Sequence, residues 1–471
     1  MSSAHAAYRP SGVLAPLALG MFMRALQLTI IAPSLLDMAT SLRAGLASLG
    51  WIIVAYATGS LIAQPIAGRL SDAKGRKLVF VAAIALFGLG SLVCALSTSF
   101  AVLILGRVIQ SLGAGAVAPA ATAIIGDSVP DDRQGGALGL IYGAFALAAV
   151  VGSVLGGVLI DAGHRLHLQF SWHLIFWVNI PLALITLLLA AGLPADKAPR
   201  QRVGFDAGAV ALIVGFAACV MGAGAAPPLQ LPLWLGAAVA CVVGLVMWER
   251  RSADPLIDPA LLREPGTALV YAIAFVSAIP IFSVTIYSAT YYMARFHASA
   301  AQAGLALLFL ALPLGLGQGA GGRLLNRFGP KGVLATGLAV LAAGLAFLAF
   351  DPQLWGVRIG LALSGLGMGL GTAPPNVLIY RYVDASRRGA ATGLLTMFAS
   401  SGAITAPAIV TASLNRGLDA AIDFRAEYLV AFALALGCIP LATLLPVAAP
   451  PARPRESEPV AVTRTPYPAV E

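Results

Sequence analysis

Apolar runs of about 20 residues, divided by short polar segments, recur from near the start of the chain to about residue 448. A helix needs roughly 20 apolar residues to cross the hydrocarbon layer of a membrane. The runs lack the continuous polar face that a helix of a soluble bundle would show. The pattern therefore predicts an all-α polytopic membrane protein.

The apolar runs predict fourteen membrane-spanning helices. Pro227, Pro228 and Pro232 divide one long uncharged stretch into two spans. The expected spans are 12–36, 49–69, 78–97, 101–124, 137–160, 173–193, 206–225, 231–249, 268–293, 302–323, 331–350, 355–379, 390–412 and 427–448. Residues 449–471 are rich in proline and mixed in charge, and we expect a disordered cytoplasmic tail there.

Composition supports the same class. Of the 471 residues, 59% are hydrophobic and 10% are charged, whereas soluble domains have about 25% charged residues. The net charge of +9 does not indicate nucleic-acid binding, because the basic residues lie in short segments between apolar runs. The four cysteines fall inside apolar runs, which favours packed thiols over disulfides or metal ligands. We expect no metal and no cofactor.

The distribution of lysine and arginine predicts the orientation. Fourteen spans place both termini on one side, where the termini and loops carry 21 of the 29 basic residues, against 5 on the other side. Loops rich in lysine and arginine stay in the cytoplasm. We therefore expect both termini to be cytoplasmic.

Residues 68–77 (GRLSDAKGRK) carry five charges among small residues. Such a segment is incompatible with hydrocarbon, and we expect a tight, hydrated turn between the second and third spans. The segment returns as residues 322–331 (GRLLNRFGPK), a shift of 254 positions, as from Gly68 to Gly322. The same shift relates further glycines and arginines, such as Arg133 and Arg387.

The duplication predicts two six-helix bundles in parallel orientation, with an inserted helix pair between them. We expect an N-terminal bundle at 1–200, an inserted linker at 201–266, a C-terminal bundle at 267–448 and the tail at 449–471. Binding sites in such folds lie near the membrane midplane between the halves.

These segments resemble the major facilitator superfamily, and within it the fourteen-helix drug:proton antiporters. The segments that carry the resemblance are 68–77, 107–113 (RVIQSLG), 152–157 (GSVLGG), 172–181 (WHLIFWVNIP), 205–208 (FDAG) and 248–257 (WERRSADPLI). The resemblance covers residues 12 to about 445. It implies a secondary transporter that works by alternating access.

Three positions depart from the family pattern. Gln27 stands where the first helix usually carries an acid, and Ser153 stands where the fifth-helix motif usually has proline. Ser111 stands where a glycine usually follows Gln110. The missing acid leaves the usual site of proton coupling without its carboxylate.

Six residues form a candidate conformational latch: Gly68, Asp72, Gly75, Arg76, Lys77 and Arg133. The glycines allow two helices to approach closely, and the charges can pair with a neighbouring helix end in one conformation only. For the lysines of this turn, a role in topology alone is the alternative.

Four polar residues within spans are candidates for substrate or proton coupling: Arg24, Gln27, Arg107 and Gln110. An arginine at membrane depth costs at least ~2.5 kcal/mol and should face a cavity or a partner. Arg24 and Gln27 are three positions apart and are expected to share a face, as are Arg107 and Gln110. Asp37, at the outer end of the first helix, is one candidate partner for Arg107. A structural ion pair, and for Arg24 packing on backbone carbonyls, are the alternatives.

Three further groups of residues have a structural and a functional interpretation. Gly152, Gly156 and Gly157 belong to a small-residue pattern that allows close helix packing. Tyr287, Tyr291 and Tyr292 fit an interfacial aromatic belt or a stacking surface for a flat solute. His164 and His167 are expected in a solvated loop.

The first functional hypothesis is a proton-coupled exporter of drug-like or metabolite solutes in a bacterial-type inner membrane. The second is a uniporter or exchanger of an anionic metabolite, favoured by Gln27, Arg24 and Arg107. The sequence has no His-Glu-x-x-His, no paired intramembrane carboxylates and no Gly-x-Ser-x-Gly, so we do not expect an enzyme. The expected partners are a small solute, protons and the lipid bilayer, and we expect a monomer.

Overall fold

The computed structural model describes residues 10–43, 46–194, 206–227, 229–251, 259–383, 388–416 and 424–446. These residues form helices and connecting segments, with no strand among them. The expected tail at 449–471 lies outside the described residues.

The helices follow the apolar runs of the sequence. In chain order they are α1 (Pro10–Thr29), η1 (Ala32–Ser34), α2 (Leu35–Ser41), α3 (Leu46–Lys74), α4 (Arg76–Ala95), α5 (Phe100–Ser128), α6 (Asp131–Arg165), η2 (Ser171–His173), α7 (Leu174–Trp177), α8 (Asn179–Ala190), α9 (Ala207–Ala225), α10 (Leu231–Glu249), η3 (Pro259–Leu262), α11 (Pro265–Phe296), α12 (Ala300–Ala306), α13 (Leu308–Phe350), α14 (Leu354–Gly371), α15 (Pro374–Tyr382), α16 (Arg388–Arg416) and α17 (Arg425–Leu444).

Thirteen segments of the described residues are long and apolar enough to cross a membrane. The remaining expected span, 137–160, lies within α6, which has 35 residues and is therefore about 52 Å long at 1.5 Å per residue. The all-helical polytopic fold is confirmed, while the count of fourteen spans stays a prediction.

The polar turn expected at 68–77 is much shorter in the structure. Helix α3 continues to Lys74 and α4 begins at Arg76, so Gly75 alone separates them. Gly75 has φ 113°, a conformation that strains any residue with a side chain. Gly329, its counterpart in the repeat, has φ 69° and breaks α13 in the same way. Among the described residues, no other glycine has a positive φ.

A second contact also recurs at the repeat distance. The Lys77 ammonium donates to the carbonyl oxygens of Ala191 and Leu193, at 2.8 and 2.7 Å, just beyond the end of α8. Lys331 donates to the carbonyl of Leu445, just beyond the end of α17. Leu445 follows Ala191 by the same 254 positions that separate Lys331 from Lys77. Each lysine thus binds the negative end of a helix dipole. The superposition of the complete halves stays a prediction.

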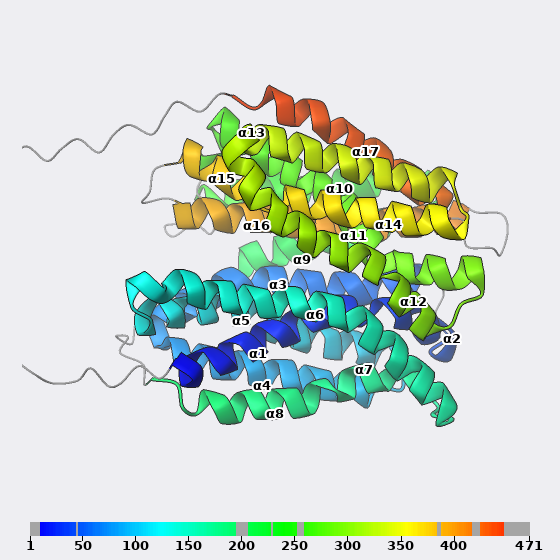
Figure 1. Ribbon diagram of the computed structural model, residues 1–471, viewed down its shortest axis with the longest axis horizontal. Coiled ribbons are helices and arrows are strands. Elements are labelled where there is room, and N and C mark those ends of the chain that lie inside the picture. Colours follow the sequence, from blue (N-terminus) through cyan, green and yellow to red (C-terminus); the bar gives the residue numbers. More distant parts are fainter. Residues whose placement is uncertain are drawn as a thin grey trace, which may run out of the picture.

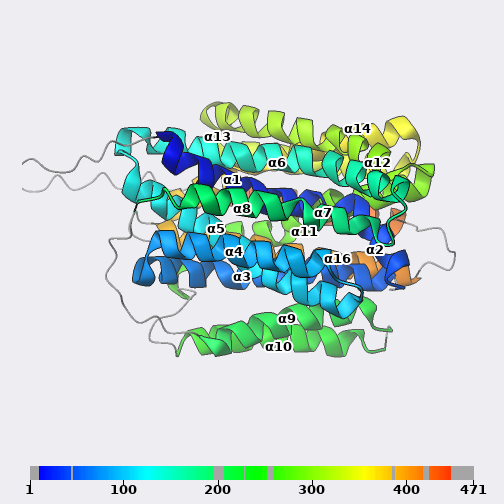
Figure 2. The same cartoon turned by 90° about the horizontal axis from the view of Figure 1, so that it is seen from below.

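Helices α1–α8 form one bundle and α11–α17 the other (Figure 1). Helices α9 and α10 lie along one side, and α9 packs on both α3 and α16 (Figure 2). We call the end of the molecule where α1 begins and α17 ends the terminal end, and the opposite end, with α2 and α12, the distal end. The domain limits proposed from the sequence stay predictions.

Helix α6 connects the two bundles through very close packing. A Cβ added at Gly156 would lie 2.3 Å from the carbonyl oxygen of Ile30, just after α1, and one at Gly157 would lie 2.2 Å from that of Ala300 in α12. Gly152 packs on α1, where a Cβ would meet the Thr29 hydroxyl at 2.2 Å and the Leu26 carbonyl oxygen at 3.1 Å. Gly156 and Gly157 accept no side chain unless the backbones move apart.

We predict that Gly156→Val destabilises the protein. Overpacking of this kind costs about 1–3 kcal/mol, so the melting temperature in detergent should fall by several degrees. Gly143→Val is the matched control, because Gly143 lies on the same helix and a Cβ there would meet nothing within 4 Å. Equal melting temperatures for the two variants would contradict the packing argument.

Candidate functional site

Arg107 is the most deeply buried cation that the structure describes. Its side chain lies between α3 and α5 and is 1% exposed. The guanidinium donates to the carbonyl oxygen of Ile52 at 3.3 Å and to Oε1 of Gln110 at 2.8 Å. It also lies 4.2 Å from the centroid of the Tyr56 ring. A cation over a desolvated aromatic ring gains about 2 kcal/mol, which offsets much of the insertion cost of the charge.

Gln110 extends this contact into a chain of polar groups. Its amide nitrogen donates to the hydroxyl of Ser91 in α4 at 2.8 Å, and Ser91 donates to the carbonyl of Phe87. Arg107 and Gln110 thus share a face as expected, and both point into the bundle. The structure gives Arg107 no carboxylate partner among the described residues, so the structural ion pair is not seen there.

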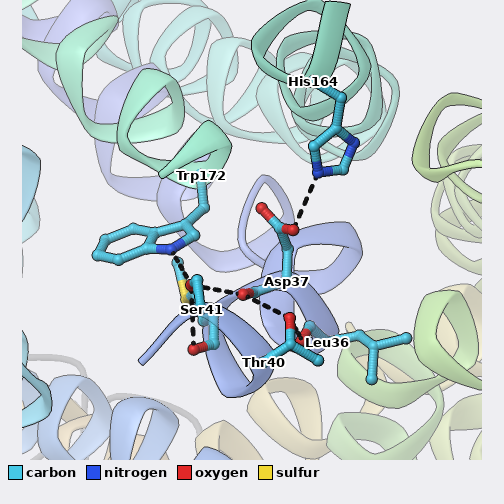
Figure 3. Close-up of polar contacts among 7 residues, drawn as sticks. Leu36, Asp37, Thr40, Ser41, His164 and Trp172 are labelled. Carbon is cyan, nitrogen blue, oxygen red and sulfur yellow. Dashed lines mark hydrogen bonds and ion pairs between the residues drawn. The ribbon is translucent and has the colours of Figure 1, made fainter. Parts of the chain in front are cut away.

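Asp37 does not reach Arg107, contrary to one suggestion from the sequence. It pairs with His164, whose Nε2 lies 3.0 Å from Oδ1 (Figure 3). Of the solvated loop expected at His164 and His167, the exposure is confirmed for both side chains, and His167 lies beyond the end of α6. His164 itself is helical, because α6 continues to Arg165 and carries this side chain to Asp37 of α2. Trp172 donates to the Ser41 hydroxyl at 2.7 Å in the same cluster (Figure 3). This cluster closes the distal end of the first bundle.

Arg24 and Gln27 contact different neighbours, although both lie on α1. The Arg24 guanidinium lies 5.8 Å from the centroid of the Phe145 ring in α6. Gln27 is fully buried and accepts a hydrogen bond at 3.0 Å from Asn179 of α8. Their contacts reach different helices, α6 and α8, and a joint role for the two side chains stays a prediction.

The candidate latch residues lie at the terminal end. Arg76 pairs with Asp127 and donates to the carbonyl of Ala123, both in α5. Asp127 is an acid that the sequence did not single out. The side chain of Asp72 lies outside the described residues, and Arg133 is exposed at the start of α6. The pairing of Asp72 with Arg133 therefore stays a prediction, as does the latch that includes Gly68.

The aromatic belt expected at Tyr287, Tyr291 and Tyr292 is wrong. These side chains are buried in the second bundle, at 3, 7 and 7% exposure. Tyr291 packs edge-on against Tyr428 of α17, with the ring centroids 5.3 Å apart. The three tyrosines face the protein interior and not the membrane interface.

Glu427 is a buried acid that the sequence analysis missed. It is 1% exposed, and neither carboxylate oxygen accepts a hydrogen bond from the described residues. The sequence predicted a last span of 427–448, so that Glu427 would be its first residue. The helix begins two residues earlier, at Arg425. Phe424, before the helix, and Tyr428, next to Glu427, are also buried, so this end of the helix lies inside the protein.

A cavity of about 300 Å³ lies between the bundles in the terminal half of the molecule. Its walls come from both bundles and from the inserted pair, and most of the lining side chains are apolar. Representative lining residues are Leu61, Gln64, Ile213, Glu249, Thr396 and Met397. Such a cavity suits a small apolar or amphipathic molecule. Among the described residues, no group of His, Cys, Asp and Glu could hold a metal ion.

Two helical bundles that enclose buried polar groups and a cavity at their seam define a polytopic membrane transporter. The family model of the Major Facilitator Superfamily matches residues 17–248 and 268–469. This chain belongs to the Major Facilitator Superfamily, as the resemblance implied, and it is a multi-pass membrane protein.

Related proteins have transport functions. The chain is 28% identical to a multidrug resistance protein of Mycobacterium tuberculosis, over 87% of this chain and 76% of that protein. It is 31% identical to a triacylglyceride transporter of Mycolicibacterium hassiacum, over 77% of this chain and 70% of that protein. The crystal structure of a D-xylose-proton symporter shares the fold, with a TM-score of 0.69 at 15% identity over 93% of this chain and 98% of that one.

We predict that Arg107→Ala reduces transport strongly while membrane insertion is retained. The change removes hydrogen bonds to a charged group that are worth about 1.5–3 kcal/mol, which shifts the equilibrium between transport conformations by up to roughly ten- to hundredfold. Initial rates in proteoliposomes are the measurement. Arg358→Ala is the control, since Arg358 lies within a span but over the rings of Phe309 and Trp355. Wild-type rates for Arg107→Ala would rule out a transport role.

Proposed function

We propose that the protein exports small apolar or amphipathic solutes by alternating access, driven by entry of protons. The observation that carries the substrate class is the largely apolar cavity at the seam, which both bundles and the inserted pair line. Relatives named for multidrug resistance and for triacylglyceride transport support a drug-like or lipid-like solute. The proton symporter of the same fold is compatible with proton coupling.

The contacts between the bundles support a conformation that is closed at the distal end. The Asp161 carboxylate of α6 accepts hydrogen bonds from the Ser299 hydroxyl at 2.8 Å and from the backbone N–H of Ala301 at 3.4 Å. Gly304 of α12 packs directly on the backbone of Ser153. The cavity lies in the opposite half. A solute would therefore enter from the terminal end and leave when the distal contacts open.

The charge distribution supports a cytoplasmic location for the terminal end. The residues expected on that side carry most of the lysines and arginines, and the positive-inside rule then orients the protein in a bacterial inner membrane. In this orientation, a solute taken up at the terminal end is exported. The latch residues around the Gly75 turn lie at the terminal end, and their ionic contacts would have to change when that end closes.

An exchanger of anionic solutes is the second candidate. The buried arginine Arg107 and the partly buried Arg24 favour it, because a positive chamber attracts anions. Gln27 also removes the acid at which the first helix usually couples protons. The ring and carbonyl contacts of Arg107 already occupy its guanidinium, which favours the first candidate.

Flux under an imposed pH gradient tests the proposal. Inverted proteoliposomes with an acidic lumen should accumulate tetraphenylphosphonium and chloramphenicol, and dissipation of the gradient should stop the accumulation. An organic anion, p-aminohippurate, should not accumulate. Anion exchange that ignores the gradient, without gradient-driven flux of the other two probes, would establish the second candidate instead.

A further inference from the structure

Glu427 differs from most of the other acids that the structure describes, because both of its carboxylate oxygens lack a partner in hydrogen-bond geometry. Most of those have a carboxylate oxygen that accepts a hydrogen bond or pairs with a cation. This holds for Asp37, Asp127, Asp161, Asp206, Glu264 and Asp351. Both oxygens of Glu427 are buried, and neither has hydrogen-bond geometry with a described residue, although the Ser283 hydroxyl lies close enough to interact with the carboxyl group. An acid in the first turn of a helix often binds free backbone N–H groups, but Glu427 makes no such bond.

The surroundings of Glu427 are apolar and aromatic, with a few hydroxyl groups. Helix α11 packs on α17 and places Ser283 and Tyr287 near the carboxyl group. The Tyr287 hydroxyl is buried and also has no hydrogen-bond partner among the described residues. Tyr428, next in the chain, shares a hydrogen bond with Ser288 at 3.3 Å. These hydroxyls can exchange hydrogen bonds with a carboxyl group.

No cation compensates a charge on Glu427 within the described residues. The titratable groups that face it are the phenols of Tyr287 and Tyr428. Arg425, two residues away, is exposed and lies 5.9 Å from the centroid of the Phe350 ring at the end of α13. Among the described residues of α13 and α16, no acid or base acts on this carboxyl group. A carboxylate buried without a partner is unfavourable by several kcal/mol.

We propose that Glu427 is the proton-binding site of the transport cycle, in place of the acid missing at Gln27. This inference rests on the proposed antiport. Glu427 holds a proton while the distal end is closed, as in this structure. When the distal end opens, water reaches the start of α17 and exchanges the proton. The coupling acid then lies in the second bundle, across the seam from Arg107. Intramembrane acids commonly serve as proton carriers.

The test is Glu427→Gln, which keeps the shape and removes the exchangeable proton. Gradient-driven accumulation of chloramphenicol and tetraphenylphosphonium should fall to the level of protein-free vesicles. Counterflow of the same probes, with no pH gradient, should persist, because it needs alternating access but no coupled proton. Asp351→Asn is the matched control, since Asp351 is a distal acid of the same bundle whose carboxylate binds a backbone N–H.

Three outcomes separate the possibilities. Retained gradient-driven accumulation in Glu427→Gln would overturn the proton site. A loss confined to tetraphenylphosphonium would also overturn it, because Glu427 would then bind the charge of the solute. A wild-type protein that transports by counterflow but ignores the gradient would refute the proposed antiport itself, and with it this inference.

Discussion

The absence of water from hydrocarbon is the constraint on which this structure depends, because each buried polar group must find its partner within the protein. Arg107 meets it through a backbone carbonyl, Gln110 and the Tyr56 ring. Glu427 does not meet it with any described residue. Arg107 and Glu427 lie in different bundles, and neither neutralises the other. A carboxylate in these surroundings is unfavourable, and protonation or contact with water removes that cost.

Close packing at the seam supplies the second requirement of alternating access. The backbones of α6 and α12 touch at Gly157 and Gly304, where no side chain fits. In the described part of the chain, polar contacts of Asp161 with Ser299 and Ala301 join the distal ends of the two bundles. Small surfaces in direct contact can slide or separate with little rearrangement of side chains. Helix α9 packs on α3 and α16, so the inserted pair covers one side of this seam.

The sequence predicted the helical membrane fold and the positions of the helices, because apolar length is decided by the membrane and not by tertiary contacts. It also related Gly75 to Gly329, whose shared positive φ the structure shows. Side-chain partners were less predictable. The spacing of Arg24 and Gln27 predicted a common face, but not that Arg24 would contact α6 and Gln27 would contact α8. Glu427 was missed because the depth of a residue near a helix end depends on how neighbouring helices cover it.

The central claim is that the two bundles rock about their seam. Distances between spin labels across the seam test it most directly, at His167 and Gln353 near the distal end and at Lys74 and Phe328 near the terminal end, all of which are exposed. When solute and pH drive the cycle, the distal distance should increase while the terminal distance decreases. Distances that stay fixed at both ends, or that change in the same direction, would contradict the account.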